Sequence, residues 1–354
     1  MVITSRTSSP PSGAPPGAPP PGDEASYAEL KRLVKEHGLL DRHPLRALAR
    51  VAIVDALLVV SVAVLFGVHI FWVQCLNALL LAFVSTQLGF TGHDAGHRQS
   101  FASTRLNDAV GLVHGNLGLG MSFSWWMDKH NRHHSHPNEI DSDPDIDIPQ
   151  LAFTPEDAAR KRGFGRFVAA HQVWFFFPLL MLVALDLQRS SVLFLLRDKV
   201  RHPKTETLLL VLHYVIYLGV IFSALPAWQA VVFIVIHKAA TGLYLGSTFA
   251  PNHKGMLLIE HNSTMDFLRR QVLTARNVRA HPLTDIWYGG LNYQIEHHLF
   301  PAMSRGNLPR AQKVIRAYCQ GHGVSYYETS MLRSYGEILA YLHAVGACLR
   351  SSVA

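Results

Sequence analysis

Cysteine is scarce in this chain, and so is charge. The three cysteines, Cys75, Cys319 and Cys348, are scattered through 354 residues, and no two of them form a CxxC pair. This spacing argues against an iron–sulfur centre, a zinc ribbon and a disulfide framework. Asp, Glu, Lys and Arg make up 16% of the residues, whereas soluble proteins average about 25%. The shortage of charge favours membrane-spanning segments over two soluble domains.

The N-terminal tail lacks both a core and a targeting signal. Residues 1–26 are rich in Pro, Gly, Ser and Ala, so we expect them to be disordered. They have neither the basic start nor the continuous apolar run of a signal peptide. The next segment, 27–37, places Leu30, Leu33 and Val34 on one helical face. We expect it to form a basic amphipathic helix on the membrane surface.

The most prominent feature of the sequence is its long apolar runs. Four runs are long enough for helices that cross a bilayer, which takes about 20 residues. They pair into two helical hairpins, one at about 51–72 and 73–91 and the other at about 207–225 and 228–250. A shorter run at 173–187 contains Pro178, and we expect it to be interfacial or re-entrant. The predicted fold is an all-α integral membrane protein with a cytoplasmic helical cap.

The positive charges indicate how the hairpins are oriented. The chain carries a formal net charge of +7, which by itself fits either nucleic acid or an anionic membrane as partner. The charges flank the apolar runs, so the sequence favours membrane lipid and not nucleic acid. Because positive residues stay in the cytoplasm, both hairpins should enter from that side and return to it. The basic residues before the first hairpin include Arg42, Arg46 and Arg50, and those before the second include Arg197, Lys199, Arg201 and Lys204.

Histidines are numerous and clustered in the predicted cytoplasmic segments. Of the 21 histidines, seven form three groups at i, i+3 and i+4 spacings, which put side chains on one helical face. Seven ligands exceed the need of one mononuclear site and indicate two metal ions, and imidazole suits iron, copper, nickel and zinc. Four lone histidines, His69, His114, His213 and His237, are expected to be interfacial side chains. The grouped residues are His93 and His97; His130, His133 and His134; and His297 and His298, with Gln294 in the place of a histidine.

These three groups resemble the histidine boxes of the membrane fatty acid desaturases. HDAGH at 93–97, HNRHH at 130–134 and QIEHH at 294–298 match HxxxH, HxxHH and [HQ]xxHH in order, between two hairpins. The resemblance covers roughly residues 45–345 of a domain that we expect to span 27–350. It implies two non-haem iron ions at the cytoplasmic face, O₂ as co-substrate, and insertion of a double bond into a fatty acyl chain. The glutamine form resembles a branch that includes front-end, linoleoyl-CoA-type and actinobacterial enzymes, which implies a multi-pass protein of a bacterial plasma membrane.

The resemblance also implies further site residues. Relatives typically add a histidine after the last span, and His253 has that position here. Gln294 occupies the slot of a ninth ligand, where it would bind weakly, through a water, or not at all. Animal acyl-CoA members have an asparagine one turn before the extra histidine; here Phe249 has that place, and Asn252 is adjacent to His253. Asp94 and Glu296 are candidates to accept a hydrogen bond from the far ring nitrogen of a ligand. The acidic residues from 139 to 147 could neutralise the site or form a loop, and we expect most of them to be loop.

Electrons are expected from a separate protein. Some relatives carry a fused cytochrome b5 with an HPGG motif, but no His-Pro pair here is followed by Gly-Gly, and no GxGxxG follows a predicted strand. A separate ferredoxin, cytochrome b5 or flavin reductase is therefore implied, and the acyl substrate could be linked to CoA, a carrier protein or a lipid. Four basic residues are candidate contacts for the donor or acyl carrier, or for lipid headgroups: Arg269, Arg270, Arg276 and Arg279.

Other functions fit the sequence less well. A hydroxylase or acetylenase would share the boxes and differ only in how the substrate lies at the irons. A histidine-rich metal transporter would place histidines within the spans along a path, whereas the clusters lie outside them. A zinc metalloprotease would need HExxH, but the first box has Asp94 in place of that glutamate, and the other two boxes would be unexplained.

Overall fold

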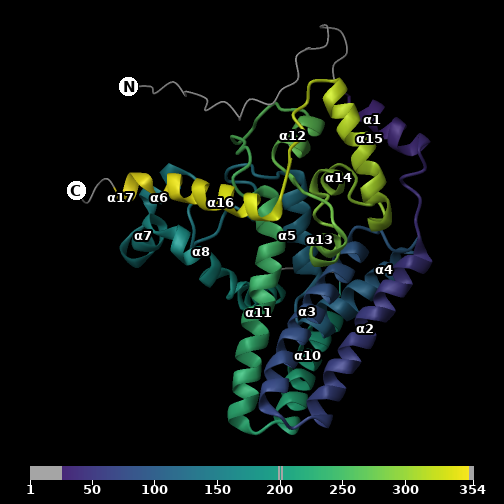
Figure 1. Ribbon diagram of the computed structural model, residues 1–354, viewed down its shortest axis with the longest axis vertical. Helices are drawn as coiled ribbons and strands as arrows, with labels where there is room; N and C mark the ends of the chain where they lie inside the picture. The colour runs from purple at the N-terminus through teal and green to yellow at the C-terminus, as the bar shows by residue number, and fades with distance from the viewer. Residues whose placement is uncertain (1–25, 198–199, 201, 351–354) are drawn as a thin grey trace.

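The computed structural model describes residues 26–197, 200 and 202–350. The tail predicted to be disordered lies outside these residues apart from Ser26. The regular elements of the described chain are helices, apart from one isolated bridge between Glu139 and Ile259 and one parallel pair of two-residue strands, in which Asn277 pairs with Glu328 and Val278 with Thr329. Four helices are long and apolar enough to cross a membrane: α2 (Pro44–Gly67), α3 (Phe71–Gly96), α10 (Pro203–Ala224) and α11 (Ala227–His253). They stand side by side in the lower half of Figure 1 and confirm the prediction of an all-α protein with two hairpins.

The two hairpin turns were not equally visible in the sequence. The second was predicted at 226–227 and lies one residue earlier, at Leu225 and Pro226, because proline cannot continue a helix and keeps the residue before it extended. The first was predicted at 72–73 but lies at Val68–Ile70, where Val68 and Ile70 have extended backbones. The segment from 68 to 72 is apolar apart from His69, so composition alone did not mark the turn.

A bent pair of helices precedes the second hairpin. Helices α8 (Gln172–Leu180) and α9 (Val183–Arg197) meet at 67° and contain the run at 173–187. Together they have the length and composition of a broken span or a re-entrant loop, so the chain has four candidate spans, or five if the pair counts as one. The interfacial placement of this segment stays a prediction.

The remaining elements form a cap at one end of the hairpins and the connections to it. A π-helical segment, η1 (Leu112–Leu119), joins α4 (Thr104–Gly111) to α5 (Phe123–Ser135) and packs against α3 and α10. The other elements are α1 (Tyr27–Glu36), α6 (Pro155–Arg160), α7 (Gly163–Ala170), α12 (Phe267–Leu273), β1 (Asn277–Val278), α13 (Pro282–Trp287), α14 (Gln294–Leu299), η2 (Arg305–Asn307), α15 (Leu308–Gly321), β2 (Glu328–Thr329), α16 (Met331–Val345) and α17 (Ala347–Arg350).

The first helix does not use its apolar face as predicted. Leu30 and Val34 are fully buried in a hydrophobic cluster of the cap that includes Ile295, Leu299 and Ile315. Figure 1 shows α1 beside α15 at the top of the molecule, away from the four long helices. The predicted membrane-surface helix is therefore wrong. An amphipathic pattern requires an apolar partner surface, and here protein provides it instead of lipid.

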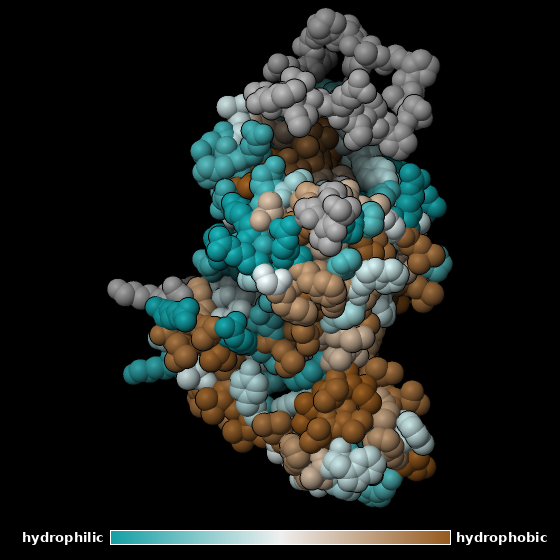
Figure 2. All heavy atoms as spheres, turned by 90° about the vertical axis from the view of Figure 1, so that its left-hand side faces the viewer, coloured by the Kyte–Doolittle hydropathy of each residue, from teal (hydrophilic) through white to brown (hydrophobic). Residues whose placement is uncertain are grey.

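Surface hydropathy separates the cap from the hairpins. Figure 2 shows a mostly hydrophobic surface over the lower half and hydrophilic residues concentrated above it. Large apolar side chains are exposed on all four long helices, among them Val59 (66%), Leu76 (67%), Val215 (63%) and Val235 (61%). Such a band is expected where lipid, rather than water, surrounds the protein. The protein is a multi-pass membrane protein with a polar cap.

Candidate metal centre

The predicted ligands converge where the hairpins meet the cap. His93 lies in the last turn of α3 and His253 ends α11, so two spanning helices carry ligands at their cap-side ends. The second box lies on α5 and the third on α14. All eight histidines predicted as ligands come together, although they lie in four separate parts of the sequence.

The eight histidines form two adjoining groups. In the first, one nitrogen from each of four imidazoles lies within 4.8 Å of the others, and the members are His93, His97, His130 and His297. The second group has three members at the same limit: His133, His253 and His298. His134 lies between them, because its Nε2 is 3.0 Å from His130 Nε2 and its ring stacks on His298 with centroids 4.2 Å apart. Each group could hold a metal ion.

The electrostatics of the site fit metal ligands. Burial lowers the pKa of five rings well below the usual value, and neighbouring imidazoles lower it further: His97, His130, His134, His297 and His298. These rings are neutral at pH 7 and offer lone pairs. Both ring nitrogens of His297, which is 1% exposed, lack a hydrogen-bond partner among the described residues. Because buried polar atoms are normally paired, a role of His297 as a metal ligand explains this arrangement.

Hydrogen bonds to Nδ1 orient the second group. The ring of His133 donates to both oxygens of Asp143 at 3.0 Å, and His298 donates to Gln271 Oε1 at 2.9 Å. The ring of His253 donates to the carbonyl oxygen of Thr274 at 3.0 Å. Because carbonyl and carboxylate oxygens accept, the hydrogen is on Nδ1 and the Nε2 lone pair faces the group. Such outer contacts fix ring orientation in metal sites.

The sequence did not mark Gln271 or Thr274, and it left open whether the acidic run serves the site. Asp143 lies in the loop, as expected, but it is 1% exposed and, with Asp145, contacts His133. Burial disfavours the charged form of His133, but these carboxylates outweigh it and raise the pKa of the ring. Gln271 also donates to the carbonyl oxygen of His134 at 2.9 Å, which joins the second and third boxes. No local spacing marked Gln271, since its partners lie 27 and 137 residues away.

The two carboxylates inside the boxes have different surroundings. Asp94 lies 3.5 Å from His93 Nδ1 and forms a salt bridge of 2.8 Å with Arg305. Glu296 faces away from the imidazoles: Asn277 Nδ2 donates to it at 2.6 Å and the Tyr326 hydroxyl at 2.7 Å. Burial raises the pKa of Glu296 to about 7. The hydrogen bonds of Glu296 tie α14 to the cap, in place of the predicted contact with a ligand ring.

Gln294 and Asn252 form a pair beside the second group. Asn252 Nδ2 lies within hydrogen-bond distance of Gln294 Oε1 (3.0 Å) and of the carbonyl oxygens of Thr248 and Leu291. These three acceptors determine the orientation of the Asn252 amide, with its NH₂ group toward them. The side-chain oxygen of Gln294 therefore accepts a hydrogen bond from Asn252. The NH₂ of Gln294 then faces His253 Nε2 at 2.9 Å. In this arrangement Gln294 presents a donor to the group, not a ligand oxygen.

The four candidate arginines are not equivalent. Arg276 is 1% exposed and bonds to Glu337, at 2.7 Å, and to backbone carbonyls, so it cannot meet a protein partner as predicted. Arg270 forms a salt bridge of 2.8 Å with Glu139, and its side chain is 16% exposed. Arg269 lies 2.8 Å from Asp266 with its side chain 41% exposed, and Arg279 is exposed. A docking role remains open only for Arg269 and Arg279.

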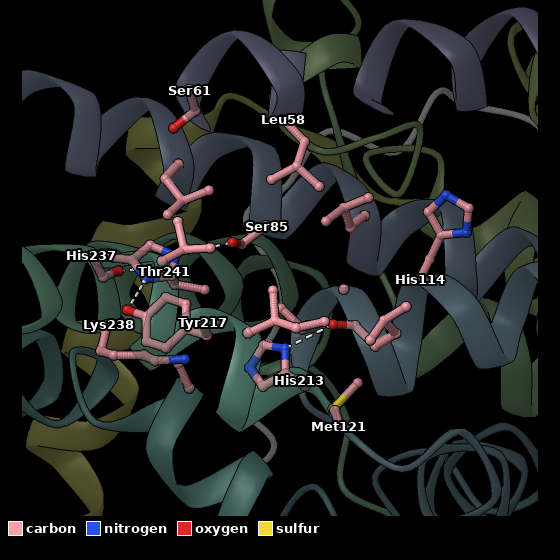
Figure 3. Close-up of a pocket in the computed structure, with 18 of the residues that line it drawn as sticks. Leu58, Ser61, Ser85, His114, Met121, His213, Tyr217, His237, Lys238 and Thr241 are labelled. Carbon is pink, nitrogen blue, oxygen red and sulfur yellow. Dashed lines mark hydrogen bonds between the residues drawn. The ribbon is translucent and has the colours of Figure 1, made fainter. Parts of the chain in front are cut away.

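A cavity of about 320 Å³ lies among the hairpin helices below the histidines. Its lining is mostly aliphatic, with Leu58, Leu65, Leu88 and Leu245 among the residues that face it. Three lone histidines also line it, and each is no more than 5% exposed: His114, His213 and His237. The prediction that these histidines are interfacial is therefore wrong, because they are buried between helices. Figure 3 shows Tyr217, His237 and Lys238 on one side of the cavity and His114 on the other.

Comparison with known proteins agrees with this geometry. The family profile described as fatty acid desaturase matches residues 70–330. An acyl-lipid (9-3)-desaturase of Physcomitrium patens is 34% identical over 76% of this chain and 53% of its own length. A Delta(6)-fatty-acid desaturase of Caenorhabditis elegans is 31% identical over 78% of this chain and 66% of its own.

A third relative, an acyl-lipid (9-3)-desaturase of Borago officinalis, is 28% identical over 87% of this chain and 72% of its own length. The chain therefore spans about half to two thirds of the first two relatives. The matched region contains all three boxes, the long helices α3, α10 and α11, and His253. Helix α2 lies outside it. The chain belongs to the fatty acid desaturase family.

Proposed function

We propose that this protein is an O₂-dependent acyl desaturase whose two iron ions are held by His93, His97, His130, His133, His134, His253, His297 and His298. The observation that carries this proposal is the convergence of these eight imidazoles into two adjoining groups at the end of an apolar helical bundle. The names of the relatives agree, since they are fatty acid desaturases.

The chemistry divides between the irons and the protein. When bound, the irons supply activation of O₂ and removal of hydrogen from an unactivated C–H bond, which side chains cannot do. The balanced reaction converts –CH₂–CH₂–, O₂, two electrons and two protons into –CH=CH– and two molecules of water. Burial keeps five of the imidazoles neutral, and Asp143, Gln271 and Thr274 orient the rings of the second group. Burial of the ligands excludes bulk water from the site.

The electrons are proposed to come from a separate ferredoxin, cytochrome b5 or flavin reductase. A carrier with an acidic docking surface would be attracted by a basic patch on the cap, because complementary charges steer association. Arg269 and Arg279 are the exposed candidates for this contact. Substitution of both by glutamate should weaken reduction by the donor and leave the iron content unchanged.

The cap is proposed to face the cytoplasm. Basic residues precede α2 and α10 on the side of the cap, in agreement with the positive-inside rule. The relatives named above are eukaryotic and lend no support to a bacterial plasma membrane, so the proposal concerns the side of the membrane alone.

The names of the relatives suggest where the double bond forms. They include Delta(5), Delta(6) and Delta(8) desaturases, and these numbers count from the carboxyl end of the chain. We infer that this protein also places its double bond on the carboxyl-proximal part of the chain. Hydroxylation or an acetylenic product is not favoured by any of these names.

Product analysis tests the function directly. The full chain is expressed in a host with a compatible reductase, and fatty acids are profiled by mass spectrometry with the double bond located. A variant with His133→Ala and His134→Ala is the control, and iron is measured in both purified proteins. We expect a new unsaturated acid and bound iron for the wild type only. Hydroxylated or acetylenic products would redefine the reaction, and bound zinc without iron would contradict the proposal.

A further inference from the structure

Helix α13 in the cap turns a row of large apolar side chains outward. Leu283, Ile286 and Trp287 lie at i, i+3 and i+4 spacings, so they share one helical face. Their exposed fractions are 71%, 56% and 40%, and all six residues of the helix are exposed or half-buried. Because a grouped apolar face of this kind marks a site of contact with protein or membrane, it indicates a partner.

The helix lies against two membrane-spanning helices. The ring of Trp287 stacks on that of Tyr244 on α11 with centroids 3.9 Å apart, and Tyr244 is buried. Gln87 Nε2 on α3 donates to the carbonyl oxygen of Ile286 at 3.0 Å. Figure 1 shows α13 below α14 and beside the cap-side part of α11. The apolar face of α13 therefore adjoins the surface that the spans present to lipid.

The contacts of α13 also give its depth. Arg50 lies 3.9 Å from Asp94 at the end of α3, and a basic residue before an apolar run marks the level of the lipid headgroups. Gln87 precedes Asp94 by seven residues on α3, which corresponds to about 10 Å of helical rise. The end of α13 is thus as deep as the apolar faces of interfacial helices, which lie about 5–10 Å into the membrane.

The backbone at both ends of α13 is satisfied by protein groups. Besides the bond from α3, the hydroxyl of Tyr244 donates to the carbonyl oxygen of Trp287 at 2.8 Å. At the start of the helix the N–H of Leu283 donates to the ring of His281 at 3.2 Å, and Pro282 has no N–H to satisfy. Backbone groups that are away from water need such partners within the protein. The hydrogen bonds and the apolar face therefore both fit a lipid environment.

The opposite side of α13 is bonded to the segment before the third box. Asp285 accepts from Asn292 Nδ2 at 2.8 Å and from the hydroxyl of Tyr293 at 3.2 Å. These two residues immediately precede Gln294, the first residue of α14. Helix α13 therefore connects the surface beside the spans to the helix that carries the third box.

We propose that α13 is inserted into the membrane, with Leu283, Ile286 and Trp287 among the lipid acyl chains, and that it holds the start of α14 at the bilayer surface. A second copy of the chain or a soluble protein could also cover an apolar face. Lipid is favoured because the face lies beside two spans, at a depth that a soluble protein does not reach. The insertion is independent of the desaturase reaction.

Spin labels measure the depth of α13 without any turnover. The three native cysteines are replaced by alanine, and Ile286→Cys provides a single site for a nitroxide. The full chain is reconstituted in phosphatidylcholine nanodiscs. Power saturation of the electron paramagnetic resonance signal then compares collisions with O₂, which concentrates among acyl chains, and with a water-soluble nickel chelate. We expect O₂ to dominate at position 286, as at Val235→Cys on α11, and the chelate to dominate at Lys313→Cys, an exposed position of α15.

Three results would overturn the insertion. Collisions with the chelate at position 286 that equal those at position 313 would place α13 in water. Protection from both O₂ and the chelate would show that protein covers the face. Dipolar broadening that disappears on dilution with unlabelled chain would identify that protein as a second copy.

Charged variants test the link from α13 to the third box. Leu283→Glu with Ile286→Glu puts two carboxylates at the depth of the acyl chains, where charge is costly, so α13 should move outward and displace the segment before Gln294. We expect this variant to lose iron, measured by elemental analysis in nanodiscs. Lys313→Glu with Gln320→Glu adds two glutamates to the exposed surface of α15 and should keep its iron. Leu283→Met with Ile286→Met keeps the face apolar and should also keep it.

Circular dichroism and size-exclusion chromatography check that the glutamate variant remains folded. Wild-type iron content in that variant would overturn the link between α13 and the third box. A wild-type protein without iron would contradict the proposed metal centre instead, and the spin labels would still decide whether α13 is inserted.

Discussion

His133 owes its orientation to a carboxylate ten residues further along the chain. Asp143 is buried and accepts from the ring at 3.0 Å through both oxygens, and it also accepts from the backbone N–H groups of Asn138 and Asp145. Its negative charge favours the ring tautomer with hydrogen on Nδ1. The loop between them is therefore part of the metal centre.

Asp143→Asn should weaken iron binding. The amide has one oxygen for three donors and carries no charge, so His133 loses its orienting partner; such changes cost about 10–100-fold in metal affinity. Iron affinity is measured by chelator competition on the purified protein. Asp147→Asn, at an exposed position of the same acidic run, is the matched control and should bind iron like the wild type. Equal affinities for the two variants would show that Asp143 does not orient the ligand.

Gln294 is expected to act without ligating iron. Its oxygen is engaged by Asn252 and its NH₂ faces His253 Nε2. Gln294→Leu has similar size, so we expect the iron content per chain to stay at the wild-type value while desaturation falls. His298→Leu, which removes an imidazole from the same helix, should lose iron. Loss of iron from Gln294→Leu, measured by elemental analysis, would make the amide a ligand after all.

The sequence located the histidines that come together better than the residues that orient them. The boxes could be found because i, i+3 and i+4 spacings are local, and a helix brings such residues together without any knowledge of the fold. The partners of the rings depend on tertiary structure: Gln271 lies 27 residues from His298, and Thr274 lies 21 residues from His253. Arg276 illustrates the same limit. Its charge suggested a position on the protein surface, whereas its side chain is buried and bonds to Glu337.

At the scale of elements, hydropathy located the four spans but not their internal contacts. The lone histidines looked interfacial, yet His237 joins three helices. The hydroxyl of Tyr217 on α10 lies 2.6 Å from His237 Nδ1, and Ser85 Oγ on α3 lies 3.0 Å from Nε2. When single polar residues lie on separate helices, the sequence does not indicate that their side chains are in contact. The π-helical η1 was likewise invisible, because its composition resembles that of an ordinary apolar helix.

His237→Leu should loosen the contact between the two hairpins. The substitution leaves Tyr217 and Ser85 without their partner in an apolar region, and hydrogen bonds between membrane helices are worth about 0.6–2 kcal/mol each. We expect a lower midpoint of thermal unfolding in detergent, with iron content retained at low temperature. Val235→Leu changes a lipid-facing position of the same helix and serves as the control. An unchanged midpoint for His237→Leu would show that the bridge adds no stability.

At the scale of the whole molecule, the metal centre constrains the topology. His93 ends one hairpin and His253 ends the other, and both belong to the same centre. The start of α10 is tied to the start of α5, because Glu206 accepts from Ser122 Oγ at 2.6 Å and from the N–H of Ser124 at 3.3 Å. We therefore predict that the segments before and after the bent pair of α8 and α9 lie on the same side of the membrane, and that the pair enters and leaves on that side.

Reporter fusions should place residues near 155 and 200 on the same side of the membrane. A fusion at the turn near Pro226 is the matched control, and it should report the opposite side because α10 crosses between them. If 155 and 200 were on opposite sides, the bent pair would be a fifth span. His253 could then join His93 only if α10 or α11 failed to cross. Because both are long, apolar helices whose exposed faces fit lipid, an even number of crossings is the arrangement that keeps all eight histidines together.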